Sequence, residues 1–476
     1  MKRNISFSSF VMGLLLVAAT GFVGTPSAQA QNSNVMYASQ RIPQTNALNP
    51  AFFPKHSKFY ISLPGANINF TSPLAYNSIF QYEPGDTAAY INLNNLIDTL
   101  SQAGNLNLDA NIYAVGLGLK LGNTFVTASA QAKVKMSLGM PNGLMTFLND
   151  GNYAHRGLGN EVYLLDGDLL NATAYAEAGV AVGHEFGNLT VGARLKVFDG
   201  YFDLSTVNTM LKLYTAEDLT SLRADVNYQL RTAGCISMDE NFHINTDDFS
   251  YLPNNWGYGV DLGAYYRGSF YEVSASILDL GSHIEWKDNI KTITPSNGEG
   301  SFSFGGLDLS GLVSGGSIDT SVYSGYKDSL IAFLDPKFSD GETYKTSIPT
   351  KFNASGMFNI TSFLRAGLLF HGEFNKTIEQ ADELNNSIRN NGFRSSTTAL
   401  AHLNLNDWVE VFASASVVDD GHKIDWFNPG FGINVSLFRT FQVYAVMDYL
   451  SNIHLVEAKS FNIYAGLNLI LSNKKN

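Results

Sequence analysis

Six charged side chains stand at alternate positions of strand-like blocks, where a strand turns them to one face. Lys133 and Lys135 alternate with apolar residues over 124–137, and Arg194 and Lys196 do so over 188–200. Side chains two residues apart lie on the same side of a strand. Counted from the neighbouring turns, the six residues fall at similar heights along their strands. This placement predicts one band of positive and negative charges on the lumen wall. This lumen band comprises Lys133, Lys135, Glu177, Arg194, Lys196 and Asp261.

Charges of both signs on the inner wall of a β-barrel have two uses. They tune the selectivity of a water-filled channel, or they pair with one another and brace the closed wall. Inward charges are seldom left unpaired, so we favour the interpretation that they brace the wall. A role in selectivity is the alternative.

One eight-residue pattern, Asp-x-Gly-x-x-Ile-acid-Trp, occurs twice. It runs from Asp279 to Trp286 and from Asp419 to Trp426, in each case where a predicted strand reaches its outer end. Tryptophan is enriched where a barrel wall meets the membrane interface. The pattern therefore predicts two strand exits at the outer rim, and a pair of related ligand contacts there is the alternative.

A proline-containing stretch precedes the first predicted strand. Two prolines, Pro50 and Pro54, cannot donate backbone hydrogen bonds, so the stretch is not a central strand. It either plugs the barrel, where Gly257, Gly259 and Gly263 would admit a close backbone approach, or simply leads into the first strand. The plug candidates are Asn49, Pro50, Ala51 and Phe52.

No motif assembles residues for catalysis or metal binding. The nine His residues are scattered, and neither a Gly-x-Ser-x-Gly elbow nor a His-x-x-x-His pair occurs. Cys235 is the single cysteine, which excludes an intramolecular disulfide and argues against a thiolate zinc site. We expect no enzyme activity, no metal and no cofactor.

Period-two alternation defines the strands that must position these residues. From Trp256 to Arg267, large apolar side chains alternate with small or polar ones, and the block from Phe461 to Leu471 behaves alike. Such blocks have about 11 residues, the length that a tilted strand needs to cross a bilayer. One face suits lipid and the other an aqueous lumen, so the sequence predicts an all-β, transmembrane antiparallel β-barrel of about 14 strands. They lie near 58–70, 106–120, 124–137, 172–186, 188–200, 256–268, 270–280, 349–360, 362–373, 395–406, 408–418, 429–438, 440–451 and 460–471.

The connections alternate between tight turns, such as 121–123 and 186–188, and long polar loops. Outer-membrane barrels have short periplasmic turns and long outer loops, and an even strand number leaves both ends in the periplasm. The segment 204–231 is itself strand-like, and we interpret it as a hairpin that rises above the membrane within one loop. Long loops are predicted near 71–105, 138–171, 201–255, 281–348 and 374–394.

The N-terminus has the pattern of a signal peptide. Lys2 and Arg3 precede the apolar run Phe10–Ala19, and Ala28-Gln29-Ala30 follows. This pattern predicts a signal peptide over 1–30, cleaved before Gln31. Residues 31–57 then form a periplasmic lead-in or plug, and 58–476 form the barrel.

Composition agrees with a barrel in the outer membrane. The 476 residues include 43 Gly, 23 Tyr and 32 Phe, and only 15% are charged. Such an aromatic, glycine-rich and charge-poor chain is typical of a wall with one face in lipid. The formal net charge of -12 argues against nucleic acid as a partner, because its binding needs a basic surface.

A resemblance to a known family rests on three short stretches. These are Asn49-Pro50-Ala51-Phe52, the run Gly257–Tyr265, and Asp279-Leu280-Gly281 with Ile284 and Trp286. Over nearly the whole mature sequence the chain resembles a large family of Bacteroidetes outer-membrane barrels of uncharacterised function. That family is in turn similar to FadL-type fatty-acid transporters and to PorV-type barrels of type IX secretion. The chain departs from the usual barrel ending, because its last residues are polar and not aromatic.

Two functions follow as hypotheses. The first is a FadL-like transporter or narrow channel for small molecules, hydrophobic ones included, which predicts a lined lumen pocket. The second is a non-conducting barrel that holds a surface or secreted protein through its long loops, as the resemblance to PorV-type proteins implies. The expected location is the cell outer membrane.

The expected partners are outer-membrane lipid and the barrel-assembly machinery, together with either a hydrophobic small molecule or a surface protein. Thr87, Thr99 and Ser329 lie in short Asp-Ser/Thr-apolar triplets that resemble Bacteroidetes O-glycosylation sites. The triplet is brief enough to occur by chance, so modification of these residues is an open question.

Overall fold

The computed structural model describes residues 34–472 apart from a set of gaps. The gaps are 40, 56, 73–79, 82–89, 92–104, 140–141, 167–168, 220, 236, 239–243, 246–253, 296–299, 305–335, 375–392, 407, 420–423, 439 and 450–458. The predicted signal peptide and the triplets at Thr87, Thr99 and Ser329 lie outside the described residues.

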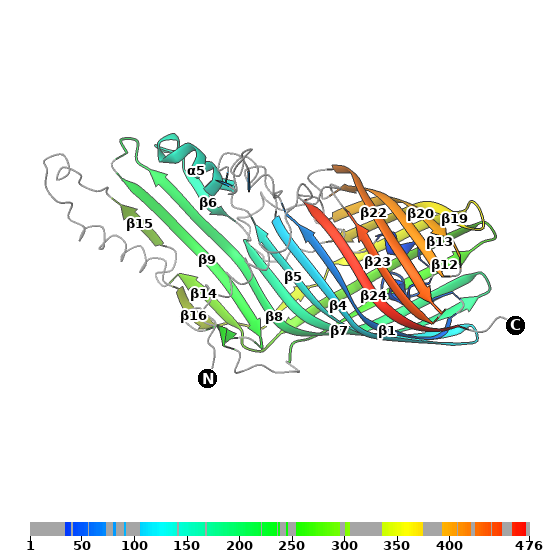
Figure 1. Cartoon of the computed structure of the whole chain (residues 1–476). Coiled ribbons are helices and arrows are strands. Elements are labelled where there is room, and N and C mark those ends of the chain that lie inside the picture. The colour runs from blue at the N-terminus through cyan, green and yellow to red at the C-terminus, as the bar shows by residue number, and fades with distance from the viewer. Residues whose placement is uncertain are drawn as a thin grey trace.

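Fourteen strands of the described chain form one closed ring in which every neighbouring pair is antiparallel (Figure 1). β24 pairs with β1 and closes the ring. The predicted all-β barrel is confirmed, and each predicted strand corresponds to one strand of the ring. In ring order they are β1 (Ser57–Thr71), β4 (Asn105–Leu121), β5 (Thr124–Gly139), β7 (Leu170–Phe186), β8 (Leu189–Thr215), β12 (Trp256–Arg267), β13 (Tyr271–Trp286), β18 (Thr350–Asn359), β19 (Leu364–Phe374), β20 (Phe393–Asn404), β21 (Val409–Asp419), β22 (Ile424–Leu437), β23 (Phe441–Asp448) and β24 (Ser460–Ser472).

The barrel wall has an apolar outside and a polar inside. On β8, Leu195 is 68% exposed on the outer face, whereas its neighbours Arg194 and Lys196 are only 3% and 4% exposed. The same alternation places Val180 and Leu368 on the outer face of other strands. Successive side chains point to opposite faces of a sheet, so the period read from the sequence sorts residues between two environments.

Tight turns join strands at one end of the barrel. Gly122 and Gly187 both have φ of +62° in the turns after β4 and β7. Short hairpin turns need positive φ, which glycine adopts at little cost. These turns keep neighbouring strands in register at the end that we assigned to the periplasm.

The same sheet continues beyond the ring at the opposite end (Figure 1). The outer half of β8 pairs with β9 (Leu222–Gly234), which confirms the hairpin predicted over 204–231. We call this part the outer sheet; it also contains β6 (Val162–Asp166), β14 (Lys291–Pro295), β15 (Gly300–Phe304) and β16 (Pro336–Asp340), with α5 (Asn142–Ala154) beside β6. The remaining short strands are β2 (Phe80–Gln81), β3 (Tyr90–Ile91), β10 (Ser237–Met238), β11 (Ile244–Asn245) and β17 (Tyr344–Ser347).

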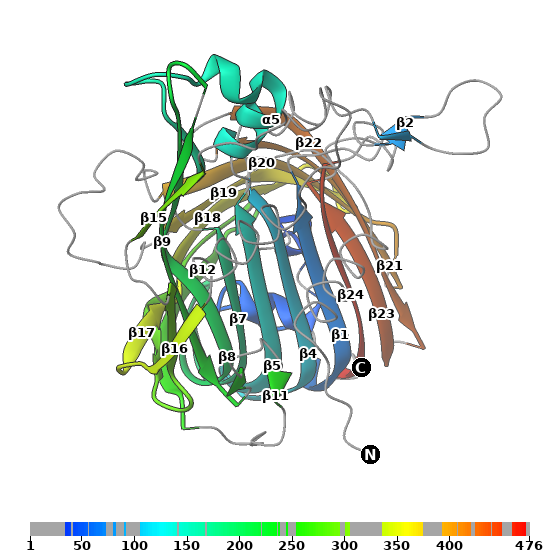
Figure 2. The same cartoon turned by 90° about the vertical axis from the view of Figure 1, so that its left-hand side faces the viewer.

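The chain before β1 lies inside the ring (Figure 2). We call residues 34–55 the N-terminal segment; it contains α2 (Asn34–Tyr37) and the 3-10 helix η1 (Pro43–Ala47). In the part of the chain that is described, no helix is long and apolar enough to cross a membrane.

Candidate functional site in the barrel lumen

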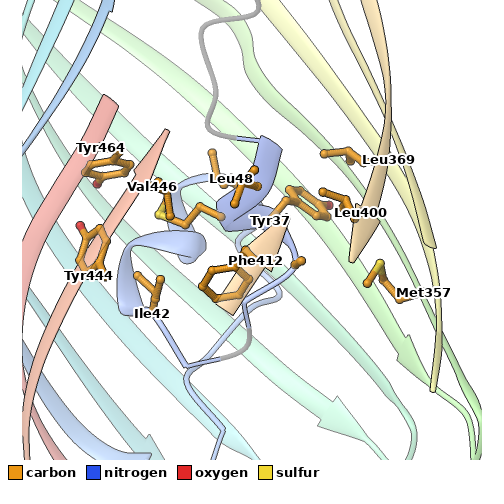
Figure 3. Packing of buried hydrophobic residues seen from close by; sticks show 13 residues of the cluster. Tyr37, Ile42, Leu48, Met357, Leu369, Leu400, Phe412, Tyr444, Val446 and Tyr464 are labelled. Atoms are coloured by element: carbon orange, nitrogen blue, oxygen red, sulfur yellow. The ribbon is translucent and has the colours of Figure 1, made fainter. Parts of the chain in front are cut away.

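One side of the N-terminal segment is apolar and packs against one half of the wall (Figure 3). Leu369 and Leu400 of the wall face inward and are 0% and 3% exposed, so water would reach them if the segment were absent. Burial of such a side chain contributes roughly 1.5–3 kcal/mol. The segment supplies Val35, Met36, Tyr37, Ala38, Ile42 and Leu48, and the wall supplies Met357, Leu369, Leu400, Phe412, Tyr444, Val446 and Tyr464.

Hydrogen bonds fix the start of the segment to the same half of the wall. The Asn34 side-chain amide donates to the hydroxyls of Ser396 at 3.1 Å and Thr398 at 2.8 Å. The backbone N–H of Val35 donates to the Asp448 carboxylate at 3.1 Å. Asp448 is the last residue of β23 and Ser396 is the fourth residue of β20, so residues 34 and 35 lie near the strand ends that are opposite the tight turns.

An ion pair fixes the middle of the segment. The Arg41 guanidinium lies 3.3 Å from the Glu410 carboxylate, which is 2% exposed. Glu410 also accepts a hydrogen bond from Asn434 at 2.7 Å and lies 3.1 Å from His402 Nε2. Gln442 donates to the Arg41 carbonyl at 3.2 Å. The wall thus holds both the backbone and the side chain of Arg41.

The other side of the segment is polar and faces β5, β8, β12 and β13. Arg194 donates to the Asn46 carbonyl at 2.9 Å and also to its side-chain oxygen, which accepts a second bond from Thr127 at 2.8 Å. Ser276 donates to the Leu48 carbonyl at 2.8 Å. A member of the lumen band, Arg194, is therefore a direct ligand of the segment.

The four plug candidates lie within the lumen. Asn49 and Ala51 are 0% and 2% exposed, and Asn49 donates to the carbonyls of Ala264 and Ala275 at 3.3 and 3.2 Å. The Phe52 ring packs edge-on against Tyr265 at 5.4 Å. Pro50 is buried as well. That these residues act as a plug remains a proposal.

Two wall glycines admit the backbone at Pro50. A Cβ at Gly192 would stand 2.2 Å from the Pro50 carbonyl oxygen, and one at Gly263 would stand 2.0 Å from the Asn49 side-chain oxygen. Of the three glycines predicted to admit the segment, only Gly263 does so. The space at Gly257 and Gly259 is taken by His283 and Ser282 of β13.

A cavity of about 90 Å³ lies beside the segment. Met36, Gln44, Ala47 and Leu48 form its floor, and five cationic and four carboxylate side chains are part of its lining. All six residues of the lumen band belong to that lining. A cavity of this size holds only a few water molecules.

Most of the lumen band is paired. Glu177 lies 2.5 Å from Lys133 and accepts a hydrogen bond from Gln131 at 2.6 Å. Asp261 lies 2.6 Å from Lys196 and 3.7 Å from Arg194. The structure therefore brings five of the six predicted residues into ion pairs, an arrangement that bracing requires. Whether the band also selects solutes stays a prediction.

Lys135 and Lys351 line the same cavity without such partners. Neither ammonium group forms an ion pair or a hydrogen bond with any described residue. Carboxylates stand opposite them across the strand pairs, Asp109 facing Lys135 and Glu373 facing Lys351. Lys351 is only 7% exposed, and a buried cation without an ion pair or a hydrogen bond is unusual.

Asp279 lies in the lumen, although the sequence pattern placed it at the rim. Its φ is +57°, and the pairing of β12 with β13 shifts register on both sides of Val260. This bulge turns Leu278 and Asp279 to the same inner side, where Asp279 forms an ion pair with Lys196. A bulge changes the alternation locally, and here it brings into the lumen a residue that the sequence pattern placed at the rim.

The two copies of the eight-residue pattern are not equivalent in space. Trp286 is 0% exposed, stacks on Tyr344 at 6.4 Å and donates to the Thr346 hydroxyl at 2.9 Å. Trp426 is 72% exposed, and Asp419 is the last residue of β21. Trp286 is the last residue of β13, as a strand exit requires, but its burial is at odds with an exposed interfacial position. A place at the rim stays a prediction for Asp419 and Trp426.

Sequence reasoning also missed residues of this site. Lys351 and Glu373 stand at alternate positions of the predicted strands 349–360 and 362–373, so alternation could have found them. Arg41 and Asn46 belong to a segment without periodicity. Nothing in their spacing indicates contacts with residues hundreds of positions away.

Comparison with family models matches residues 50–448 to a family of unknown function, DUF5723. The chain belongs to this family. The DUF5723 match begins at Pro50 in the N-terminal segment and ends at Asp448 on β23, so it includes every residue of the lumen band. The predicted membership of a family of uncharacterised function is confirmed, and a Bacteroidetes origin stays a prediction.

This DUF5723 chain is also similar to solved structures. The toluene transporter TbuX of Ralstonia pickettii has 8% identity and a TM-score of 0.42, with 95% of this chain and 97% of that one covered. A FadL homologue of Pseudomonas aeruginosa has 10% identity and a TM-score of 0.43, with 94% and 98% covered. The Pseudomonas putida toluene transporter TodX has 9% identity and a TM-score of 0.39, with 94% of each chain covered. No curated protein matches the chain by sequence.

Proposed function

We propose that this protein is an outer-membrane channel for a small charged solute and that its N-terminal segment is the gate. Support for the location comes from the outward side chains. Large apolar residues such as Leu195 and Leu368 are 68% and 58% exposed on the outer face. Apolar surface over a whole barrel wall suits lipid and not water.

The gate is inferred from one observation: the segment contacts the wall on two sides, through different kinds of interaction. Its apolar side rests on the β18–β24 half of the wall, whereas its other side contacts β5, β8, β12 and β13 through hydrogen bonds. A hydrogen bond contributes only about 0.5–1.5 kcal/mol net, because water replaces it on release. The polar side can therefore detach while the apolar side keeps the segment in the barrel.

Detachment on that side would join the cavity to the periplasmic end of the lumen. The cavity lies directly on Gln44 and Leu48, and Arg194 bridges the cavity lining and Asn46. Because the lining is rich in charged groups, a charged cargo fits it better than the hydrophobic cargo considered from the sequence.

The test is a substitution that disturbs only the polar side. In Gly192→Val the new side chain would press on the Pro50 backbone, whose carbonyl oxygen lies 2.2 Å from the position of the added Cβ. Overpacking of this kind costs about 1–3 kcal/mol, so the open fraction should rise about tenfold. Single-channel recording in a planar bilayer measures the effect.

Gly356→Val is the matched control, because a Cβ at Gly356 meets nothing within 4 Å. Heat-modifiable mobility on a gel verifies that both variants keep a folded barrel. An open fraction in Gly192→Val no higher than in Gly356→Val would contradict the gate.

A second candidate is a non-conducting platform for a surface partner. The observation in its favour is the outer sheet, in which β8 runs 27 residues and carries β6 and β9 beyond the ring. A channel does not need such an extension. A Gly192→Val variant that is folded and silent would favour this candidate.

A further inference from the structure

We propose that the lumen cavity is a binding site for an anionic group, either a carboxylate or a phosphate, held by Lys135 and Lys351. The proposal rests on the proposed function in one respect only, since the anion would be part of the cargo that passes the gate. The site itself can exist and be measured without any passage.

Burial of an ammonium group without a partner costs free energy. Lys351 is 7% exposed and lines the cavity, and no described residue gives it an ion pair or a hydrogen bond. Buried charges are normally paired or hydrogen-bonded, because removal from water costs several kcal/mol. A group that breaks this rule is an expected feature of a binding site.

Three carboxylates of the cavity already have cationic partners. Glu177 and Asp261 are occupied by Lys133 and Lys196, at 2.5 and 2.6 Å. Asp279 is also occupied by Lys196. These carboxylates are therefore committed, and they leave Lys135 and Lys351 as the groups that can accept a new anion.

Two further carboxylates stand opposite the two lysines on neighbouring strands. Asp109 and Glu373 are the cross-strand neighbours of Lys135 and Lys351, yet neither pair forms an ion pair. One oxygen of Glu373 is buried without a hydrogen-bond partner. The wall thus holds the lysines in an electrostatically favourable environment but does not neutralise them by contact.

The volume and the lining of the cavity suit a small oxyanion. The cavity of about 90 Å³ is large enough for a carboxylate or phosphate group but not for a bulky solute. Two ammonium groups that converge on one small space fit an oxyanion, whose oxygens each accept charge-assisted hydrogen bonds. The same space is floored by Leu48 and Met36, so a bound anion touches the N-terminal segment.

The experiment measures equilibrium binding by the refolded full-length barrel in detergent. Inorganic phosphate and acetate are the two probes, and the affinity of each is followed by its effect on the temperature at which heat-modifiable mobility is lost. We expect at least one probe to raise that temperature. Binding of both, or of one, supports the site and identifies which oxyanion it prefers.

The variants are Lys135→Gln, Lys351→Gln and the double variant. Loss of two charge-assisted bonds should weaken binding at least about tenfold in the double variant. The matched control is Lys337→Gln with Lys345→Gln, two exposed lysines of β16 and β17 outside the cavity. This control should bind like the original chain.

Two results would overturn the proposal. One is no effect of either probe on the original chain, and the other is unchanged binding by the double variant. If the double variant does not fold, the two single variants decide in the same way. Failure of the gate shows as unchanged conductance in Gly192→Val, whereas failure of the anion site shows in these binding curves.

Discussion

Lys196 links two carboxylates in the lumen wall. It lies 2.6 Å from Asp261 and also contacts Asp279, and all three side chains are at most 5% exposed. Lys196→Met would remove the ammonium group that both buried carboxylates contact. Breaking a buried pair costs about 3–5 kcal/mol, and we expect a loss of that size in the free energy of unfolding, measured by urea titration in lipid vesicles.

Lys120→Met is the control for that loss. Lys120 lies 2.5 Å from Glu185, but the two side chains are 27% and 34% exposed. Partly exposed pairs of this kind contribute at most about 1 kcal/mol. Equal destabilisation by the two substitutions would mean that burial does not decide the strength of the lumen pairs.

At the scale of single residues, the sequence predicted which charged side chains share a wall but not which of them form ion pairs. Alternation alone placed Lys133, Glu177 and Lys196 on one wall, because strands and tight turns are regular. The repeated pattern placed Asp279 at the rim, because nothing in the spacing shows the bulge that brings it into the lumen. Alternation also could not show that Lys135 lacks an ion pair, because that depends on side-chain conformation and not on register.

At the scale of elements, the outer sheet contains a buried carboxylate. Asp203 on the outer half of β8 accepts hydrogen bonds from Tyr344 and Thr173, both at 2.7 Å. Burial raises the pKa of Asp203 above its usual range, and these hydrogen bonds offset only part of the effect. The folded sheet therefore binds a proton more tightly than the unfolded chain does.

The sign of the pH dependence follows from that difference. A carboxyl group whose pKa is raised by folding stabilises the fold when protonated, and this stability is lost as the pH rises through the folded pKa. Amide hydrogen exchange of β9 and β17 should therefore show more protection, after correction for intrinsic rates, near pH 4 than near pH 7. Asp203→Asn should remove the difference, whereas Asp225→Asn on β9, whose side chain is 25% exposed, should keep it.

The elements themselves were largely predictable. Each strand of the ring has a period of two and is bounded on one side by a turn such as 121–123 or 186–188. The hairpin of β8 and β9 was also recognisable from alternation. The N-terminal segment was not, because α2 and η1 are short helices whose shape is set by contacts with the wall and not by local propensity.

At the scale of the whole molecule, the gate requires the N-terminal segment to move relative to the barrel. A cross-link between the two tests this directly. The Asn49 Cγ atom lies 3.0 Å from the position of a Cβ at Gly263. The sulfur of a cysteine at 49 would stand near that Cγ, which brings Asn49→Cys and Gly263→Cys within disulfide reach.

The cross-linked chain should carry Cys235→Ser as well, so that the native thiol cannot pair. We expect oxidised Asn49→Cys/Gly263→Cys barrels to show few or no openings in a planar bilayer, because the disulfide ties the polar side of the segment to β12. Reduction with dithiothreitol should restore openings within the same recording. Each single-cysteine variant should be insensitive to the reductant.

The cross-link separates a gate from a fixed filling of the lumen. A gate must leave the wall for solute to pass, so its tether blocks current reversibly. A fixed filling does not move, and its tether changes nothing. Equal currents in the oxidised and reduced forms, whether large or absent, would show that the segment is part of a static wall and would leave the outer sheet as the functional surface to pursue.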